Sequence, residues 1–352
     1  MFNSKENPYD AIFEAQKIAF GPFVFQTARV LRDSGILRHL FEYRKIGQSL
    51  QQIQDVVDID RYGIKVMLDF AESFNLVARE NGLYTITKVG YFILKDTMTR
   101  VNMDFVHDIC YKGFFNLEES IQEGKPAGLI ELGSWKTIYE GLSKLTEQQQ
   151  KSWFSFDHFY SDKAFPEALP LVFNHEPSKI MDIGGNTGKW SFQCVEYSTD
   201  VKMTIVDLPG QLNKALQAAE EKGYGERIEG YQADLLDQST VLPQGYDLVW
   251  MSQFLDCFSE SEIVSILQKA KEAIDQNGYI CILETFCDRQ PNPAAEYCIN
   301  ATSLYFTCIA NGNSRMYHAG DMVSLVEQAG LKVVEEHNEV GTFHTLLFCQ
   351  KN

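Results

Sequence analysis

The chain has 352 residues, of which 45% are hydrophobic, and its 31 basic and 48 acidic residues give a formal net charge of −17. That length allows two domains, the apolar content argues against disorder, and the acidic charge excludes nucleic acids and other polyphosphates, which bind to clusters of lysine and arginine. An apolar signal core is absent from the N-terminal residues M-F-N-S-K-E-N-P-Y-D. The sequence has no run of about 18 apolar residues, which a membrane span would need. The eight cysteines are not spaced as in a disulfide framework or a metal site. We therefore expect a cytoplasmic protein with reduced thiols and without a metal, acting on small molecules.

Residues 1–100 carry the pattern of a winged helix. Ser49 and Gln52 form a capping box at the start of a helix, and Asn81-Gly82 joins two alternating runs as in a two-residue hairpin. Apolar residues at helical spacing mark two further helices, at Phe20, Val24, Ala28 and Leu31 and at Ile64, Met67, Leu68, Ala71 and Phe74. Three helices followed by a hairpin predict a winged-helix domain.

The charges of this domain argue against DNA binding. The helix that would enter a groove has two basic residues, Arg61 and Lys65, against the acids Asp60, Asp69 and Glu72. Because a groove-reading helix needs basic partners for the phosphates, we do not expect it to bind DNA.

The first predicted helix is apolar on more than one face, with Phe20, Phe23, Val24 and Phe25 close together. A helix of this kind is usually buried. Two explanations are open at this point, packing against a second copy of the chain and packing within the domain's own core.

Residues 101–165 are predicted to be helical and are rich in aromatic side chains. We interpret them as a connector that also roofs a pocket, although most of these rings also suit an ordinary core. The rings are Trp135, Tyr139, Trp153, Phe154, Phe156, Phe159 and Tyr160.

Residues 166–352 alternate between strand and helix patterns, which predicts an α/β fold with a parallel, doubly wound, Rossmann-like sheet. The stretch D-Q-N-G at 275–278 is expected to end a helix before the next strand begins. In such a sheet, ligands bind at the carboxyl ends of the strands. The predicted strands are 178–182, 202–207, 228–233, 246–251, 279–284, 331–335 and 344–349.

Three of these strands end in an acid: Asp182, Asp207 and Asp234. Asp182 runs directly into the turn G-G-N-T-G, where it would repel a pyrophosphate, and that turn is not the G-x-G-x-x-G of an NAD site. An adenosine cofactor with a cationic, phosphate-free tail fits better, namely S-adenosylmethionine. Asp182 would then face the ammonium or sulfonium group, Asp207 the ribose and Asp234 the adenine amine; taken singly, each acid also suits a helix N-cap.

The chain resembles the class I methyltransferases, in particular the group that contains plant small-molecule O-methyltransferases, hydroxyindole O-methyltransferase and bacterial polyketide O-methyltransferases. The matching stretches are M-D-I-G-G-N-T-G, V-D-L-P, A-D-L-L, Y-D-L-V-W-M-S-Q-F-L-D-C-F-S-E, N-G-Y-I-C-I-L-E and N-G-N-S-R. The resemblance implies a winged-helix dimerisation domain over 1–100, a helical connector over 101–165 and an S-adenosylmethionine-binding Rossmann-like domain over 166–352. It also implies a homodimer formed through the N-terminal domain.

The resemblance implies a cofactor site built from the glycine turn and the strand ends. Gly184 would lie against the methionine part of the cofactor, Asp207 would bind the ribose, and Asp234 with Leu235 would flank the adenine. Ser252 takes the place of a cofactor-contacting lysine of the plant enzymes. The implied cofactor residues are Asp182, Gly184, Gly185, Gly188, Asp207, Leu208, Asp234, Leu235, Ser252 and Phe258, the last in the place of a tryptophan.

The departures from the family pattern concern the loop and the catalytic base. Asn186 replaces a glycine of the D-x-G-G-G-T-G pattern, and asparagine tolerates left-handed backbone better than most residues. Asp256 stands where the family has the catalytic histidine of L-H-D-W. Of the two acids that flank this histidine, Glu284 matches one and Ser314 replaces the other.

Several roles for Asp256 are open: a general base, a contact to a cationic substrate, or an N-cap for the helix S-E-S-E-I-V. The reaction also proceeds without a base if the acceptor is only oriented. His158, in F-D-H-F-Y, is a candidate replacement base because this segment resembles the family's pocket-lining F-N-x-A-M; the alternative is a partly exposed connector histidine.

The predicted function is transfer of a methyl group to a small-molecule acceptor, with an oxygen acceptor as the default and nitrogen, sulfur or carbon open. A flat aromatic acceptor is favoured by the predicted pocket residues. The alternatives are a protein that binds the cofactor without methylating, a ligand-responsive regulator and an NAD oxidoreductase. The predicted substrate-binding residues are Phe156, Phe159, Tyr160, Asn300, Tyr305 and Phe306.

Overall fold

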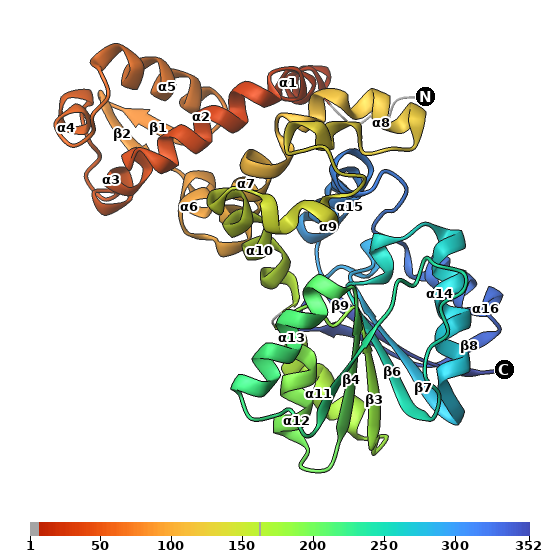
Figure 1. The fold of residues 1–352 in the computed structure, drawn as a ribbon. Helices are drawn as coiled ribbons and strands as arrows, with labels where there is room; N and C mark the ends of the chain where they lie inside the picture. Colours follow the sequence, from red (N-terminus) through yellow and green to blue (C-terminus); the bar gives the residue numbers. More distant parts are fainter. Residues whose placement is uncertain (1–6, 162) are drawn as a thin grey trace. The chain divides into compact units, whose positions relative to one another are not determined.

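The computed structural model describes residues 7–161 and 163–352. The chain divides into two compact units, one ending at Val106 and the other beginning at His107 (Figure 1). Most of the predicted connector, 101–165, therefore belongs to the same unit as the large sheet. Among the described residues, no helix combines the length and apolarity needed to cross a membrane.

The first unit contains the predicted helices and the hairpin. Ser49 and Gln52 form both hydrogen bonds of the capping box, and Asn81 and Gly82 both have positive φ, 50° and 79°. Positive φ at both central residues is what a tight two-residue hairpin requires. The elements are α1 (Pro8–Ala19), α2 (Gly21–Asp33), α3 (Ile36–Glu42), α4 (Leu50–Gln54), α5 (Arg61–Ser73), β1 (Val77–Glu80), β2 (Leu83–Ile86), α6 (Lys88–Lys95) and α7 (Thr97–Phe105).

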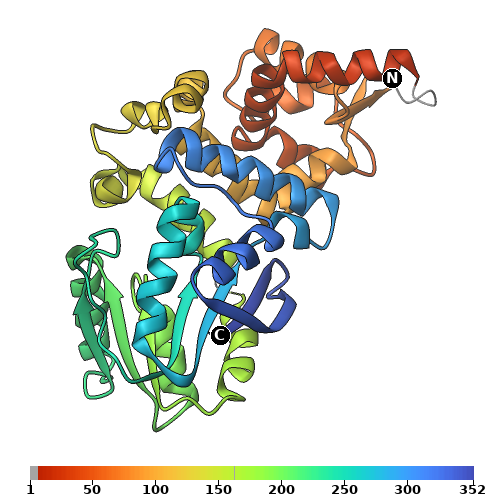
Figure 2. The ribbon, with the colours of Figure 1, turned by 90° about the vertical axis from the view of Figure 1, so that its right-hand side faces the viewer.

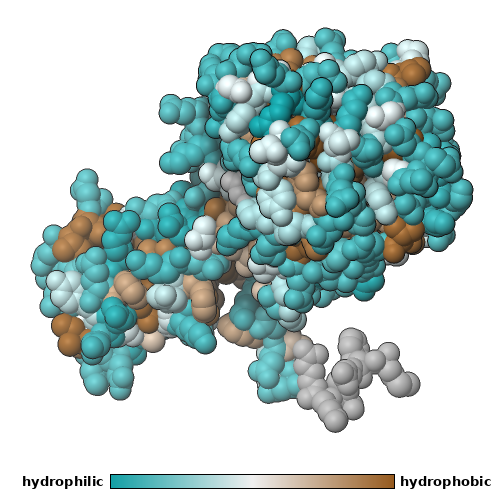
Figure 3. All heavy atoms as spheres, turned by 90° about the horizontal axis from the view of Figure 1, so that it is seen from below, coloured by the Kyte–Doolittle hydropathy of each residue, from teal (hydrophilic) through white to brown (hydrophobic). Residues whose placement is uncertain are grey.

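The core of this unit is built from one side of α2, α3 and α5, around Leu31, Leu37 and Leu68. Helix α1 contributes no buried residue, and apolar patches are visible on the surface of the unit in Figure 3. The exposed apolar side chains of α1 and α2 and the residue between them are Tyr9, Ile12, Phe13, Ile18, Phe20 and Phe23.

The second unit begins with short helices, continues into the strand and helix alternation and ends in a hairpin. Its first part contains η1 (Val106–Cys110), η2 (Gly113–Asn116), α8 (Leu117–Glu123), η3 (Ala127–Glu131), α9 (Ile138–Gly141), η4 (Leu142–Lys144), α10 (Glu147–Ser161) and α11 (Phe165–Phe173). The later helices are α12 (Lys189–Tyr197), α13 (Pro209–Glu221), η5 (Leu255–Cys257), α14 (Glu260–Ala273), η6 (Cys287–Arg289), α15 (Pro293–Tyr305), η7 (Phe306–Ala310) and α16 (Ala319–Gln328). The strands are β3 (Lys179–Ile183), β4 (Lys202–Asp207), β5 (Ile228–Gln232), β6 (Tyr246–Ser252), β7 (Ile274–Glu284), β8 (Leu331–Val340) and β9 (His344–Lys351).

These seven strands form one sheet in the order β5-β4-β3-β6-β7-β9-β8. Strands β3 to β7 run parallel, and the chain moves outward from β3 through β4 to β5, then returns to β6 on the other side of β3. The order therefore reverses between β3 and β6, which is where a doubly wound sheet binds its ligand. Figures 1 and 2 show α11, α12 and α13 covering one face and α14 and α16 the other.

Two details of the sheet differ from the prediction. Strand β9 is antiparallel to β7 and β8, because only three residues separate β8 from β9 and a parallel crossover needs about a dozen. Strand β7 begins at Ile274, so the stretch 275–278 lies within the strand. Ile274 pairs with Tyr246 and Tyr279 pairs with Leu248, so residues 275–278 form an irregularity in the pairing of β7 with β6.

The alternation of side chains in β3 and β6 separates two cores. Met181 and Val249 pack against α14 and α16, while Ile180 and Leu248 pack against α11 and α12 on the opposite face. Burial on both faces holds the strand ends in fixed positions, and the site is built on those ends.

Candidate functional site

The glycine turn after β3 is held close to the end of β4. Gly184 has a φ of 71°, and its amide donates to the carbonyl of Val206 at 2.8 Å. A Cβ at Gly184 would lie 2.3 Å from the ring of Phe254, so only glycine fits. Asn186 has a φ of 50°, which agrees with the expectation that asparagine accepts the left-handed backbone here.

Asp207 connects the glycine turn to the end of β4. Its carboxylate accepts hydrogen bonds from the backbone amides of Asn186 at 2.9 Å and Leu208 at 2.7 Å. Burial raises the pKa of Asp207, and these two hydrogen bonds oppose the shift. The side chain lines a cavity, as does that of Asp234 beyond β5.

Asp182 lies beneath the glycine turn, outside the cavity lining. Its Oδ2 accepts from the hydroxyl of Ser191 on α12 at 2.7 Å. Burial raises the pKa of Asp182 to about 7, with Ser191 opposing the shift and the charge of Asp207 adding to it. In the structure Asp182 thus ties β3 to α12, and its expected contact with a cofactor tail stays a prediction.

The cavity at the strand ends has a volume of about 510 Å³ and lies within the second unit. A cavity of this size is typical of a small-molecule site. The predicted residues that line it are Phe156, Tyr160, Gly184, Asp207, Leu208, Asp234, Leu235, Asp256, Phe258, Tyr305 and Phe306. The predicted residues outside the lining are His158, Phe159, Asp182, Gly185, Gly188, Ser252, Glu284 and Asn300.

Helical periodicity explains which residues of α10 reach the cavity. The lining residues Trp153, Phe156, Asp157 and Tyr160 are spaced three, four and seven apart, so they share one face of the helix. His158 falls off this face and packs on the ring of Phe154. His158 was chosen because its segment resembles a pocket-lining stretch of the family. Asp157 was not predicted and Trp153 was named only as one of the rings of the connector, although helical spacing from Phe156 and Tyr160 identifies both.

The same reasoning applies to α15. Ile299 and Thr302 of α15 and Phe306 at the start of η7 line the cavity at helical spacing, whereas Asn300 lies one residue away from that face. The indole nitrogen of Trp153 donates to the hydroxyl of Tyr305 at 2.8 Å, so α10 and α15 are joined at the cavity wall.

Asp256 lies in η5 and lines the cavity. The N-cap of the following helix is Ser259, which forms a capping box with Glu262. The N-cap alternative for Asp256 is therefore wrong.

A network of buried groups surrounds Asp256. Glu284, at the end of β7, accepts from the amides of Phe254 at 3.0 Å and Leu255 at 2.9 Å and so fixes the turn that carries Asp256. Burial raises the pKa of Asp256 to about 7, the thiol of Cys257 opposes the shift, and the charge of Asp157 adds to it. Burial and the charge of Asp256 likewise raise the pKa of Glu284.

No histidine belongs to the lining of this cavity among the residues that the structure describes. His344 is fully buried on β9, and His318 is half exposed beside Asp288, 4.0 Å away. Neither of these histidines, considered as weaker candidates for a base, lines the cavity. Asp256 is thus an ionisable group with a raised pKa on the cavity wall, which is a property shared by many catalytic acids and bases.

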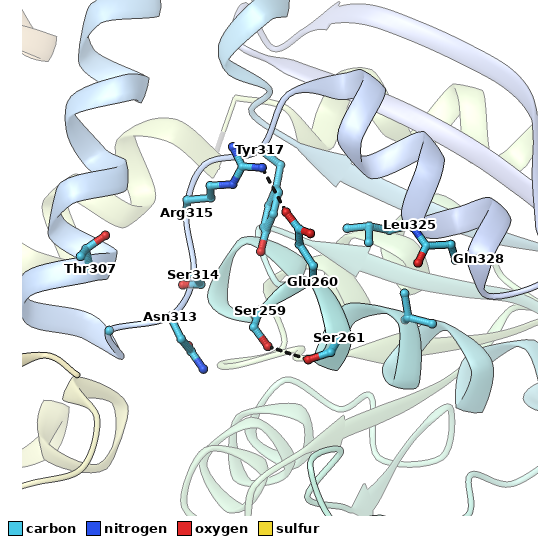
Figure 4. Close-up of a pocket in the computed structure, with 12 residues that line it drawn as sticks. Ser259, Glu260, Ser261, Thr307, Asn313, Ser314, Arg315, Tyr317, Leu325 and Gln328 are labelled. Atoms are coloured by element: carbon cyan, nitrogen blue, oxygen red, sulfur yellow. Dashed lines mark hydrogen bonds and ion pairs between the residues drawn. The ribbon is translucent and has the colours of Figure 1, made fainter. Parts of the chain in front are cut away.

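A second, more open groove of about 860 Å³ lies beside α14 and α16 (Figure 4). Its basic residue, Arg315, pairs with Glu260 at 3.2 Å and with Asp321 at 2.8 Å. Because both carboxylates already neutralise Arg315, this groove has less to offer a charged ligand than the cavity at the strand ends.

Comparison with known families places both units. Residues 167–332 match the model of the O-methyltransferase domain, and residues 13–84 match that of the Dimerisation2-like domain. The chain thus carries a domain of the O-methyltransferase family. Members of this family use S-adenosylmethionine, so the protein is an S-adenosylmethionine-dependent small-molecule methyltransferase.

Relatives of this methyltransferase act on different atoms. It is 21% identical to L-tyrosine C(3)-methyltransferase of Streptomyces lavendulae over 89% of this chain and 85% of that protein. It is 30% identical to 3-hydroxy-5-methyl-1-naphthoate 3-O-methyltransferase of Streptomyces sahachiroi over 44% of each chain. The fold is also that of the methyltransferase SibL, with a TM-score of 0.71, 21% identity and coverage of 95% of this chain and 98% of SibL.

The residues at the strand ends fit S-adenosylmethionine. The Oδ1 of Asn186 and the Oε1 of Gln253 are buried at the cavity wall without a hydrogen-bond partner among the described residues. Buried acceptors of this kind need donors, and the cofactor carries an ammonium group, ribose hydroxyls and an adenine amine. Gly184 lines the cavity, with the ring of Phe254 where a Cβ would stand.

Proposed function

We propose that this methyltransferase transfers a methyl group to a hydroxyl of an aromatic small molecule, with Asp256 receiving the hydroxyl proton. The observation that carries the proposal is the position of Asp256, a buried carboxyl on the wall of a cavity whose described lining contains no histidine. When bound, S-adenosylmethionine supplies a methyl group that is already activated by its sulfonium sulfur.

The residues of the chain divide into two sets in this proposal. Asp207 and Asp234 hold the ribose and the adenine, with Asn186 and Gln253 beside them. Trp153, Phe156, Tyr160, Tyr305 and Phe306 hold the aromatic acceptor. Burial of the acceptor between rings excludes water and orients the hydroxyl, which supplies much of the acceleration for a displacement of this type.

Glu284 supports Asp256 without touching the acceptor. It does not line the cavity, and its hydrogen bonds to the amides of Phe254 and Leu255 hold the turn in place. We assign it a positioning role.

Replacement of Asp256 tests the proposal. General bases contribute about 10²- to 10⁴-fold, so Asp256→Asn should lower kcat by at least about 100-fold and leave the affinity for S-adenosylhomocysteine unchanged. Because the pKa of Asp256 is raised to about 7, its carboxylate form increases as the pH rises through 7, and wild-type kcat should rise between pH 6 and pH 8.

The measurement is turnover of a panel of phenols across this pH range. Glu272→Gln, on the exposed surface of α14, serves as the control and should behave as the wild type. Unchanged kcat in Asp256→Asn would show that the reaction needs no base at this position.

We further propose that the protein is a homodimer formed through its N-terminal unit. The support is the match of residues 13–84 to a Dimerisation2-like domain together with the exposed apolar side chains of α1 and α2. Such a set of apolar residues on one unit is typical of an interaction surface.

A further inference from the structure

A chain of hydrogen bonds runs along the cavity wall and ends at Asp256. The hydroxyl of Tyr139, on α9, donates to the sulfur of Cys257 at 3.1 Å. The thiol of Cys257, on η5, donates in turn to the Oδ1 of Asp256 at 3.4 Å. All three residues line the cavity. Because a thiol can accept one hydrogen bond while it donates another, Cys257 connects Tyr139 to the carboxyl.

Both donors of this chain keep their protons near neutral pH. Burial raises the pKa of the Cys257 thiol well above its usual value, and the charge of Asp256 adds to the shift. Burial also raises the pKa of the Tyr139 hydroxyl well above its usual value. Donors in series polarise one another and favour the charged form of the carboxylate on which they end.

The loop after η7 holds the backbone of Cys257. The Nδ2 of Asn311 donates to the carbonyl of Cys257 at 2.7 Å. Asn311 is itself fixed by the buried Ser314, whose hydroxyl accepts from its Nδ2 at 2.8 Å and whose amide donates to its Oδ1 at 3.2 Å. Ser314, where the resemblance places an acid, thus supports the residue that holds Cys257.

These partners suit a carboxylate better than a histidine. A neutral histidine that accepts a proton at one nitrogen carries its own proton on the other, and this nitrogen needs an acceptor such as an acid. An ionised carboxyl has only acceptor oxygens, so it needs donors. The change of histidine to Asp256 and the change of an acid to Ser314 are therefore consistent with each other, because a thiol donor now serves the base.

Other titratable groups act on Asp256 or Cys257 through their charges. They are Asp157 on α10, Glu284 on β7, Tyr305 on α15 and Tyr317 before α16. The variants proposed below at positions 139 and 257 leave all four groups in place. A difference between these variants and the wild type therefore reports on the hydrogen-bonded chain.

We propose that Tyr139 and Cys257 are positioning residues of the methyl transfer, which hold the carboxylate of Asp256 in place and in its charged form. This inference rests on the proposed function, since it concerns the base of the same site. Asp256 receives the hydroxyl proton of the acceptor, while Cys257 keeps its own proton. Neither Tyr139 nor Cys257 was among the predicted site residues.

The S–H stretching band of the infrared spectrum tests the contact without a substrate. Subtracting the spectrum of full-length Cys257→Ala from that of the wild type isolates the band of Cys257; Cys257→Ser serves the same purpose if the alanine variant does not fold. A thiol donates more strongly to a carboxylate than to a carboxylic acid. The band should therefore move to lower frequency as the pH rises, with a midpoint at about 7, and should not move in Asp256→Asn.

Turnover of the phenol panel against pH tests the role in the reaction. Without the thiol donor the carboxylate of Asp256 is less favoured, so the pKa that controls kcat should rise by about one unit in Cys257→Ala. At pH 7 kcat should then fall about fivefold, and at pH 9 it should return close to the wild-type value. The affinity for S-adenosylhomocysteine should not change.

Two further variants separate the donor from the side chain that carries it. Cys257→Ser keeps a donor and should restore the pH profile, whereas Tyr139→Phe removes the second donor and should shift the profile in the same direction as Cys257→Ala by a smaller amount. Matched controls are Cys298→Ala on α15 and Tyr231→Phe, whose hydroxyl donates to the carbonyl of Val241. Neither control residue lines the cavity, so both variants should keep the wild-type profile.

The outcomes separate this inference from the proposed function. Unchanged kcat in Asp256→Asn would remove the proposed function. If Asp256→Asn lowers kcat as expected, an unmoved pH profile in Cys257→Ala, or an equal shift in Cys257→Ala and Cys257→Ser, would overturn the positioning role alone. A Cys257 S–H band that does not respond to pH would overturn it as well, even if none of the phenols is methylated.

Discussion

At the scale of single residues, environment decides function more than residue type does. Asp182, Asp207 and Asp234 look equivalent in sequence, as acids that end neighbouring strands. In the structure, Asp182 is buried against Ser191, whereas Asp207 and Asp234 reach the cavity. The sequence could predict that the three acids gather at one sheet edge, because parallel strands share that edge. It could not predict which of them would face inward, since this depends on the partner that α12 supplies.

The proposed catalytic residues show the same limit. The resemblance stated from the sequence implied that Asp256 stands in place of the family's histidine, with Glu284 as its partner. The capping alternative was excluded only by the hydrogen bonds of Ser259. His158 was selected because its segment resembles a pocket-lining stretch of the family, and the residue lies off the cavity face of α10.

His344 gives a prediction about acid stability. It is fully buried, and burial lowers the pKa of its imidazole to about 4, with the carbonyl of Val340 opposing the shift. Below pH 6.5 the unfolded chain binds a proton at this histidine that the folded chain does not, so its contribution to stability falls as the pH falls from about 6.5 toward 4. The slope is at most about 1.4 kcal/mol per pH unit.

The test is urea unfolding of the wild type and His344→Leu at pH 7, 6 and 5. The free energy of unfolding of the wild type should fall relative to the variant as the pH decreases. The comparison with the variant is needed because Asp182 and Asp256, whose pKa values are raised to about 7, contribute with the opposite sign in this range. A difference between the two proteins that does not change with pH would contradict the assignment.

At the scale of helices and strands, local signals predicted most elements. The capping box of α4, the Asn81-Gly82 hairpin and the strand alternation are all present. Helices α1 and α3 were not predicted, although Asn7 caps the start of α1 and Pro8 is its first residue. The antiparallel direction of β9 was not predicted, because the periodicity of a strand does not indicate its direction. The short connection between β8 and β9 does indicate it, since a parallel crossover needs more residues.

The turn between β8 and β9 carries a prediction about packing. Gly341 has a φ of 61°, and a Cβ there would lie 2.5 Å from the backbone of Ala164. Gly341→Ala should therefore destabilise the protein by about 1–3 kcal/mol, through backbone strain and overpacking.

Gly320, in the first turn of α16, provides the matched control because nothing lies within 4 Å of a Cβ placed there. Gly320→Ala should be neutral or slightly stabilising, since alanine favours a helix over glycine by about 1 kcal/mol. Denaturant unfolding measures both. Equal stability of the two variants would show that the contact at Gly341 relaxes freely.

At the scale of the whole molecule, composition and resemblance predicted a dimerisation domain followed by a cofactor-binding domain. The acidic charge of the chain argued against DNA binding by the winged-helix domain, and residues 13–84 match a Dimerisation2-like domain. The apolar surface of α1 and α2 could not be foreseen fully, because α1 was not predicted as a helix. The sequence also could not predict which elements meet at the cavity wall, because α10, η5 and α15 are far apart in the sequence.

Dimerisation through this surface is directly testable. Ile18 on α1 and Phe23 on α2 are among the most exposed apolar side chains of the first unit. Ile18→Asp with Phe23→Asp should shift the protein from dimer to monomer in sedimentation velocity, because a dimer interface does not accommodate unpaired charges. Val241→Asp, an equally exposed apolar position in the second unit, should leave the dimer intact. A double variant that still sediments as the wild type would place the interface elsewhere.

The most direct test of the whole account is calorimetric titration of the wild type and of Asp207→Ala with S-adenosylhomocysteine, with NADH as the control ligand. We predict one S-adenosylhomocysteine bound per chain, no NADH bound, and a loss of affinity of at least about 100-fold in Asp207→Ala, whose carboxylate contributes charged hydrogen bonds to the site. The Asp207→Ala protein should remain folded although it loses two hydrogen bonds to the backbone, and far-UV circular dichroism separates loss of the site from loss of the fold. Binding of NADH in place of S-adenosylhomocysteine, or unchanged affinity in Asp207→Ala, would contradict the account.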